Sequence, residues 1–302
     1  MQTLNEIRQL LCDAGLEPRK RFGQNFLYDQ NLLGKLLELA EIEAGGVVLE
    51  VGPGTGSLTE ELLARAERVV AVEIDRGLHA LLSNRLGGQE KLTLLCGDVL
   101  AGKHAIAPEV LDALGGSAVL VANLPYNIAT PLVALCLEGT CRALSEPGRA
   151  GLCRFDRLTF TVQHEVADRL AAGAGSKDYG PVSILVALLG DVQLGPPIPP
   201  VAFWPRPGVV SRMVRIDFDA EAAGKLRDID MLKRVVQLAF AQRRKQIHSA
   251  GRRKGARIDL AAFDKALARA NIERSLRPEQ VTPEQYLQLA NFLAEESSRP
   301  PR

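Results

Sequence analysis

The sequence predicts an α/β protein in which a parallel sheet is followed by a smaller all-α region. From VVLEV at 47–51 to about residue 162, short apolar runs alternate with amphipathic stretches of helical spacing. Strands that alternate with helices in this way build parallel sheets covered on both faces. Near residue 222 the composition turns charged, and beyond it the apolar positions follow helical spacing. We therefore expect one domain at 1–222 and a helical domain at 223–302.

The composition is that of a globular protein, with 46% hydrophobic and 24% charged residues in a chain of 302. A formal net charge of +1 neither favours nor excludes nucleic acid as a partner, because a binding face needs only a local excess of charge. The five cysteines form no CxxC pair, so we expect reduced thiols and no metal site. No signal peptide and no membrane span is recognisable. We expect a monomeric cytoplasmic protein with no membrane association.

Two helices are predicted ahead of the sheet, at 4–14 and 30–41, because their apolar positions recur at helical spacing. The basic, glycine-containing RKRFGQNFL at 19–27 is expected to form an ordered loop between them. Ser57, directly after a group of glycines, is the expected N-cap of the next helix. The elements predicted within the sheet region are strands at 47–51 and 69–74, a helix from 76, strands at 92–95 and 118–123, a helix from 130 and a strand at 158–162.

Farther along the chain, one helix is predicted at 179–190 and a final strand at 212–218, where RMVRIDF alternates apolar and polar residues. The proline-dense stretch 194–210 between them is expected to form no regular element, because proline has no amide hydrogen to donate. Residues 230–295 are predicted to form several amphipathic helices.

A glycine turn, GPGTG, joins the first strand to a helix and would lie at the carboxyl end of the sheet, where such sheets bind ligands. The spacing departs from the dinucleotide pattern GxGxxG, and a glycine turn alone is a weak signal. The next two strands end in carboxylates: Glu73 can accept both hydroxyls of a ribose, and Asp98 an adenine amino group. Either carboxylate alone is more often a cap or a solvated loop residue. Together with Gly52, Gly54 and Gly56 they predict an adenosine pocket.

The stretch NLPYN ends the following strand at the same edge of the sheet. Asn123 offers a side-chain oxygen and Leu124 a main-chain carbonyl, which Pro125 holds in an extended conformation. Two neighbouring acceptors suit a primary amine, and the Tyr126 ring can stack on the base that carries it. An exocyclic adenine amine is a poor nucleophile, and hydrogen bonds that draw both N–H groups out of the ring plane return the lone pair to nitrogen. The plainer alternative is a turn with a tyrosine in the core.

These motifs, together with RFGQNFL, FWPRP and FAQRRKQI, stand in the order typical of one family. From about Lys20 to about Asn291 the chain resembles the S-adenosylmethionine-dependent ribosomal RNA adenine dimethyltransferases of the KsgA/RsmA type. The resemblance implies a Rossmann-like class I methyltransferase sheet with an N-terminal helical extension, and a small all-α C-terminal domain that binds RNA or substrate. It also implies transfer of methyl groups from S-adenosylmethionine to N6 of two adjacent adenosines near the 3′ end of 16S, small-subunit, ribosomal RNA, giving N6,N6-dimethyladenosine during ribosome biogenesis.

Carried over position by position, the resemblance assigns roles to individual residues. Those expected at the cofactor are Gln24, Asn25, Leu27, Gly52, Gly54, Glu73, Asp98 and Asn123. Those expected to hold the target adenine are Asn123, Leu124, Pro125, Tyr126 and Phe203, the last as a second aromatic face around a base removed from its stack. The chain departs from the family at Pro181, where Arg is usual, and at Gly208 and Val210, where Lys and Asp are usual.

A basic segment at 242–258 carries seven Lys or Arg and no acidic residue. Such a segment is typical of a phosphate-binding face, whose affinity falls as salt rises. The plainer alternative is a solvated helix end. A second basic cluster precedes the expected cofactor loop. The residues predicted to contact RNA are Arg19, Lys20, Arg21, Arg243, Arg244, Lys245, Arg252, Arg253 and Lys254.

The leading hypothesis is therefore a ribosomal RNA adenine dimethyltransferase acting on the small subunit. Two alternatives keep the same fold: a resistance-type methylase for adenine N6 of large-subunit RNA, and a catalytically silent ribosome assembly factor. A nicotinamide dehydrogenase is a third alternative, weakened by the GxGxG spacing and by the lack of a proton donor beside Asn123. Cofactor binding and methyl transfer distinguish these hypotheses.

Overall fold

A computed structural model describes residues 1–102, 104–252 and 258–297, and the chain forms two compact units. Unit 1 contains residues 1–167 and 192–218, and unit 2 contains residues 168–191 and 219–302. Residues 168–191, expected in the first domain, thus group with the C-terminal helices. One reason is Tyr179, which is fully buried and donates a hydrogen bond from its hydroxyl to the carbonyl of Val281 at 3.0 Å.

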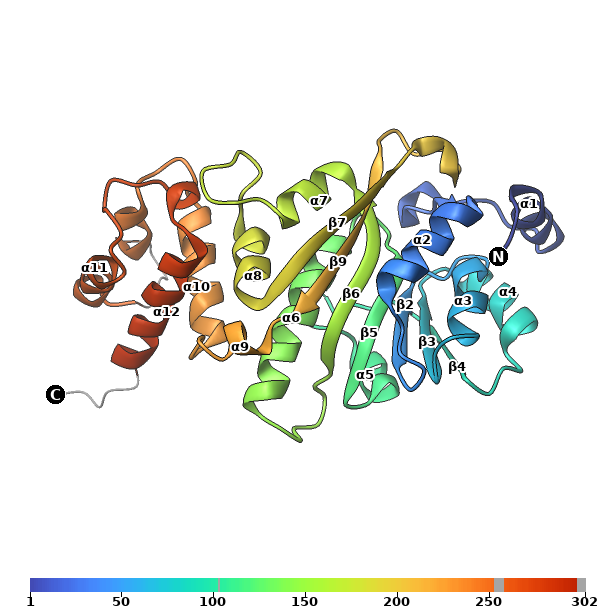
Figure 1. The fold of residues 1–302 in the computed structure, drawn as a ribbon, viewed down its shortest axis with the longest axis horizontal. Helices are drawn as coiled ribbons and strands as arrows, with labels where there is room; N and C mark the ends of the chain where they lie inside the picture. The colour runs from blue at the N-terminus through green and yellow to red at the C-terminus, as the bar shows by residue number, and fades with distance from the viewer. Residues whose placement is uncertain (103, 253–257, 298–302) are drawn as a thin grey trace. The chain divides into compact units, whose positions relative to one another are not determined.

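Unit 1 is built on a seven-stranded sheet with the order β4-β3-β2-β5-β6-β9-β7 (Figure 1). The five strands from β4 to β6 are parallel, and β9 runs antiparallel to β6. This is the Rossmann-like order, so the predicted fold class is confirmed. The strands are β2 (Val47–Val51), β3 (Arg68–Glu73), β4 (Leu92–Cys96), β5 (Ser117–Asn123), β6 (Arg154–Gln163), β7 (Gly190–Ile198) and β9 (Ser211–Phe218).

Helices pack on this sheet through their apolar sides. Leu36 of α2 and Leu62 of α3 share one buried cluster with Val48 and Val121 of the sheet. α1 packs Ile7 and its neighbours onto α4 in a second buried cluster. The helices of unit 1 are α1 (Leu4–Asp13), α2 (Gln30–Ala40), α3 (Ser57–Leu63), α4 (Arg76–Leu86), α5 (Pro108–Leu114) and α6 (Ala129–Ser145).

Several local predictions were wrong. β7 runs through Pro196 and Pro197, which it tolerates because it is the edge strand of the sheet. The same proline-dense stretch also forms a short strand, β8 (Phe203–Trp204), that pairs with β1 (Phe26–Leu27). Gly56, not Ser57, is the N-cap of α3. Helices α5 and α7 (His164–Leu170) were not predicted.

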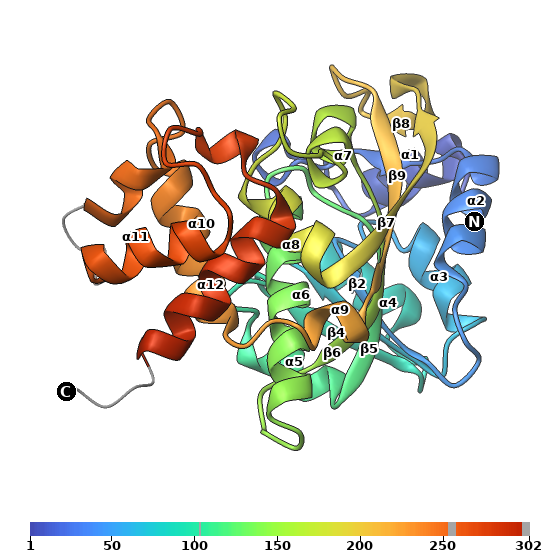
Figure 2. The same ribbon diagram turned by 60° about the vertical axis from the view of Figure 1, so that its left-hand side comes forward.

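Unit 2 is helical, as predicted for the C-terminal region. Figures 1 and 2 both show α10, α11 and α12 side by side, and the buried rings of Phe263 and Tyr286 lie on α11 and α12. Asp228 and Asp259 cap the N-termini of α10 and α11. Pro181 occupies the first turn of α8, where a proline suits a helix. The helices are α8 (Pro181–Leu189), α9 (Ala220–Ala223), α10 (Ile229–Phe240), α11 (Leu260–Arg269) and α12 (Pro283–Ser297).

Candidate active site

A cavity in unit 1 lies at the carboxyl ends of the parallel strands β2, β3, β4 and β5. Residues predicted at the cofactor and residues predicted at the target amine line the same cavity. The predicted residues that line it are Gln24, Asn25, Leu27, Gly52, Gly54, Glu73, Asp98, Asn123, Leu124, Pro125 and Tyr126. The structure therefore joins the predicted adenosine pocket and the predicted amine site.

The glycine turn after β2 requires glycine for two separate reasons. Gly52 and Gly54 have φ values of 72° and 62°, in the left-handed region that side chains disfavour. A Cβ at Gly54 would also meet the Phe26 ring at 2.8 Å, and one at Gly52 would meet the Pro125 ring at 3.3 Å. The turn thus packs closely against RFGQNFL and NLPYN at once.

The carboxylate of Glu73 holds this turn in place. Glu73 is 3% exposed and accepts hydrogen bonds from the Gly54 amide at 3.2 Å and the Asp75 amide at 2.8 Å. Burial raises the pKa of Glu73 to about 7, although these hydrogen bonds oppose the shift. Asp98 is exposed and accepts from the Leu100 amide at 2.9 Å. The two carboxylates therefore differ in environment, although Glu73 ends β3 and Asp98 lies two residues after β4.

Glu50 also lines the cavity, and it was not predicted as a site residue. It is 1% exposed, and one of its carboxyl oxygens, Oε2, has no hydrogen-bond partner among the described residues. Burial raises the pKa of Glu50 to about 8, and the nearby charge of Glu73 adds to the shift. The sequence feature that could have identified Glu50 as a site residue was a single carboxylate inside the apolar strand VVLEV. A buried, unpaired carboxyl beside a cavity suits a cationic or hydrogen-donating ligand.

The amide of Asn123 is held from two sides. Its Nδ2 donates to the carbonyl of Asn25 at 2.9 Å, and its Oδ1 accepts from the Thr161 hydroxyl at 2.5 Å. These two bonds define which end of the amide is the acceptor. An oxygen of this kind has two lone pairs, so Oδ1 retains one for a ligand N–H.

The hydroxyl of Tyr126 is held in a similar way. It shares a hydrogen bond of 2.7 Å with the hydroxyl of Ser211, a fully buried residue at the start of β9. Burial raises the pKa of Tyr126, so the phenol stays neutral near pH 7. The ring is half-buried and lines the cavity, where it can stack on a base. Thr161 and Ser211 were not predicted as site residues, because each lies far from NLPYN in the sequence.

One predicted residue, Phe203, lies differently from expectation. Phe203 is 2% exposed, packs in the cluster that contains Leu27, and is not among the residues that line the cavity. The aromatic rings that line the cavity are those of Phe22, Phe26 and Tyr126. Gln24 is one of the residues that line the cavity, and its Nε2 donates to Asp75 at 3.0 Å.

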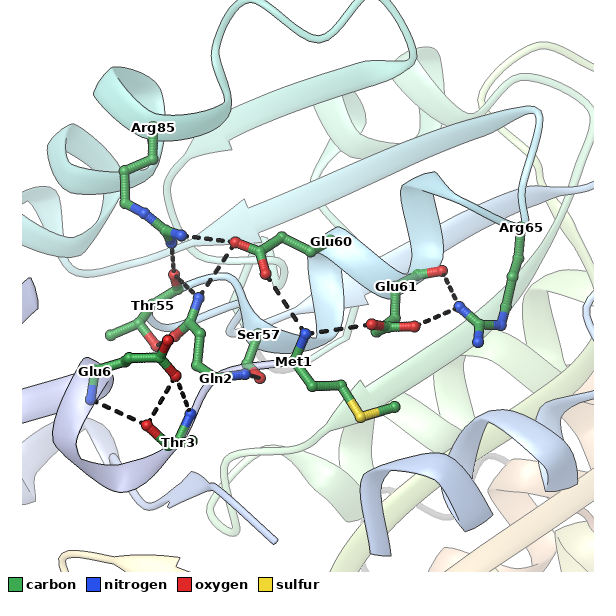
Figure 3. A network of polar contacts seen from close by, with 10 residues as sticks. All are labelled: Met1, Gln2, Thr3, Glu6, Thr55, Ser57, Glu60, Glu61, Arg65 and Arg85. Carbon is green, nitrogen blue, oxygen red and sulfur yellow. Dashed lines mark hydrogen bonds and ion pairs between the residues drawn. The ribbon is translucent and has the colours of Figure 1, made fainter. Parts of the chain in front are cut away.

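The N-terminal segment covers one side of the glycine turn. Figure 3 shows Gln2 against the turn: it donates from Nε2 to the Thr55 carbonyl at 3.1 Å and from its amide to the Ser57 hydroxyl at 3.0 Å. Farther along, Ile7 of α1 is 1% exposed and lines the cavity. The first helix therefore forms part of the cavity wall.

The predicted RNA-contacting residues differ in their surroundings. Arg19 forms an ion pair with the buried Asp75 at 3.3 Å, so it also has a structural role. Arg243 donates to the carbonyl of Lys177 at 2.7 Å. The exposed residues include Lys20, Arg21, Arg244, Lys245 and Arg252, while Arg253 and Lys254 lie outside the described residues. Over the described ranges we find neither a helix fit to span a membrane nor a cluster of metal-ligating side chains.

Comparisons with known proteins give matches over most of the chain. The model of the ribosomal RNA adenine dimethylase family matches residues 15–295. The ribosomal RNA small subunit methyltransferase A of Magnetococcus marinus is 40% identical over 291 residues, covering 96% of this chain and 97% of that protein. The protein of the same name from Phenylobacterium zucineum is 38% identical over 274 residues, covering 90% of each chain.

Solved structures show the same fold. A dimethyladenosine transferase from Plasmodium falciparum superposes with a TM-score of 0.69 at 21% identity, covering 90% of this chain and 98% of that one. The 23S rRNA methyltransferase ErmE superposes with a TM-score of 0.60 at 26% identity, covering 89% of this chain and all of that one.

Proposed function

The chain belongs to the ribosomal RNA adenine dimethylase family, and from that premise we propose that it dimethylates N6 of adenosines in small-subunit ribosomal RNA with S-adenosylmethionine as methyl donor. The proposed targets are two adjacent adenosines near the 3′ end of that RNA. The observation that carries the proposal is the shared cavity, which is lined by the glycine turn and Glu73 as well as by Asn123 and Tyr126.

The cavity residues fit S-adenosylmethionine. Gly52 and Gly54 of the glycine turn line the cavity and carry no side chain, so their backbone can approach a ligand closely. Asp98 is exposed at the cavity and is free to accept from an adenine amine, while Glu73 can accept from ribose hydroxyls. The orphaned Oε2 of Glu50 suits the positively charged part of the cofactor.

When bound, S-adenosylmethionine would supply an electrophilic methyl group on a cationic sulfur, which would keep the C–S electron pair and leave as a neutral thioether. Asn123 Oδ1 and the carbonyl of Leu124 accept the two N–H groups of the target amine and direct its lone pair away from the ring. Tyr126 offers its ring to the flipped base. The nitrogen becomes cationic on transfer and loses one proton to water, so no strong general base is required.

The test is radiolabelled methyl transfer to undermethylated small ribosomal subunits, with the RNA digested to nucleosides. We expect label in N6,N6-dimethyladenosine with the wild-type chain, and a loss of at least about 100-fold with Asn123→Ala, which removes an orienting acceptor. Binding of S-adenosylmethionine, measured by calorimetry, should fall far less than the activity does, because Asn123 is one of eight residues expected at the cofactor. No transfer to small or large subunits by the folded wild type, with cofactor binding retained, would favour a silent assembly factor.

Transfer to large subunits alone would instead favour the resistance-type activity, to which the likeness with ErmE gives some weight.

We propose a monomer that acts in the cytoplasm. The cytoplasmic location is in keeping with five cysteines that are all free thiols. The RNA is proposed to contact the basic residues of both units. The domain roles proposed are cofactor binding and chemistry for the sheet domain and RNA binding for the helical domain.

A further inference from the structure

We propose that two buried hydroxyl groups, those of Thr161 on β6 and Ser211 on β9, are positioning residues that set the orientation of Asn123 and Tyr126 for methyl transfer. The inference rests on the methyl-transfer function proposed above and adds two residues to it. Neither hydroxyl lines the cavity, and both residues are fully buried. Each acts through another side chain and not by contact with the substrate.

The sheet register places these groups on one face. Asn123 on β5 is the direct register partner of Thr161 on the parallel strand β6. Thr161 in turn pairs with Met213 on the antiparallel strand β9, and Ser211 lies two residues before Met213. Register partners point to the same face of a sheet, as do residues two apart in one strand. The polar row therefore crosses three strands behind the NLPYN motif.

The hydrogen bonds give this row its function. Thr161 donates to Asn123 Oδ1 at 2.5 Å, and the Asn25 carbonyl accepts from Asn123 Nδ2 at 2.9 Å, so the amide cannot flip without losing both bonds. Thr161 occupies one lone pair of Oδ1 and leaves the other for the target N–H. Ser211 shares its 2.7 Å bond with the Tyr126 hydroxyl and so restrains the plane on which the base stacks.

Restraint of the Asn123 amide and the Tyr126 ring matters for the rate of methyl transfer. The target nitrogen has little nucleophilicity of its own, so the rate depends on how accurately its N–H groups are held. An enzyme in which the Asn123 amide rotated freely would still bind the base through stacking on Tyr126. It would no longer hold the target amine in the productive geometry. Loss of either hydroxyl should therefore lower kcat more than it alters KM for the subunit.

The test for Thr161 uses a matched set of variants on one strand. Thr161→Val removes the hydroxyl at nearly constant volume, and Thr161→Ser restores it. Thr159→Val is the control, because Thr159 is equally buried on β6 and its hydroxyl has no hydrogen-bond partner among the described residues. We expect Thr161→Val to lower kcat about 5- to 20-fold with KM and cofactor affinity within about twofold, Thr161→Ser to recover most of the loss, and Thr159→Val to match wild type.

The test for Ser211 is a double-mutant cycle with Tyr126→Phe. We expect Ser211→Ala and Tyr126→Phe each to lower kcat/KM several-fold and the double variant to be no worse than either single one, because both remove the same hydrogen bond. Additive losses would overturn the role of Ser211.

Equal losses in Thr161→Val and Thr159→Val, or full activity in Thr161→Val, would overturn the role of Thr161 and leave it a packing residue. These outcomes are separate from failure of the proposed function, because that failure would appear as absence of dimethyladenosine with the wild-type chain.

Discussion

At the residue scale, the site combines side chains with very different degrees of burial. Glu50 and Glu73 are almost completely buried, whereas Asp98 at the next strand end is exposed. Burial of a carboxyl favours its protonated form, so two of the three carboxyls in the cavity hold protons more tightly than usual. Their charge state near neutral pH therefore depends on what occupies the cavity.

The first prediction concerns the pH dependence of stability. The pKa of Glu50 is raised to about 8 in the folded protein, so the folded state binds a proton that the unfolded state has lost above about pH 4.5. The contribution of Glu50 to the free energy of unfolding is fully present at low pH and is lost as pH rises through about 8. We expect the free energy of unfolding of the cofactor-free protein to fall between pH 5.5 and 8.5, measured by urea unfolding. Glu50→Gln should flatten this fall, and an unchanged slope would contradict the assignment.

The second prediction concerns the glycine turn. Gly54→Ala places a Cβ at a φ of 62° and 2.8 Å from the Phe26 ring, so we expect a loss of about 1–3 kcal/mol in unfolding free energy and weaker binding of S-adenosylmethionine. Gly15→Ala is the control, because Gly15 has a φ of 64° but open space around its Cβ position. The control should lose about 1 kcal/mol with unchanged cofactor affinity. Equal cofactor affinity in both variants would show that the clash is harmless.

At the element scale, α1 is part of the site as well as of the core. Its sequence predicts an amphipathic helix, and its capping box at Thr3 explains where the helix begins. Only the tertiary structure shows that Ile7 reaches the cavity while Leu11, one turn later on the same apolar side, packs on α4 without lining it. The same helix thus offers a variant pair that separates packing from ligand contact.

The third prediction uses that pair. Ile7→Ala and Leu11→Ala each remove a buried aliphatic side chain, so we expect both to lower the unfolding free energy by about 2–4 kcal/mol. Only Ile7→Ala should also weaken S-adenosylmethionine binding, by about 3- to 10-fold in calorimetry, because it removes part of the cavity wall. A similar weakening in Leu11→Ala would mean that docking of the whole helix, and not the Ile7 contact, sets the affinity.

At the scale of the whole molecule, the near-neutral net charge conceals a local basic excess. The basic segment 242–258, with its seven Lys or Arg, belongs to unit 2. Within it, Arg244, Lys245 and Arg252 are exposed. Affinity for RNA through such residues depends on release of counterions. Chemistry is thus proposed for unit 1, whereas most of the predicted RNA-contacting cations belong to unit 2.

The fourth prediction tests this division. Each phosphate contact contributes about 0.9 to the slope of log affinity against log salt for a duplex and about 0.7 for a single strand. We expect Arg244→Ala and Lys245→Ala each to weaken subunit binding and to reduce the salt slope by about 1, with S-adenosylmethionine affinity unchanged. Lys35→Ala, an exposed cation of α2 outside the predicted RNA face, is the control. A slope equal to wild type in the unit 2 variants would place the RNA elsewhere.

The sequence alone predicted most strands and helices of the sheet region in their correct order, the glycine turn and the polar residues at three strand ends, because periodicity and turn chemistry are local properties. It also predicted the family through ordered motifs. Three features became visible only in the folded chain: the grouping of residues 168–191 with unit 2, the edge position that lets β7 contain prolines, and the burial of Phe203. The positions of the buried Thr161 and Ser211 hydroxyls behind NLPYN also became visible only in the folded chain. Each depends on pairing between segments far apart in the chain, which local propensities do not encode.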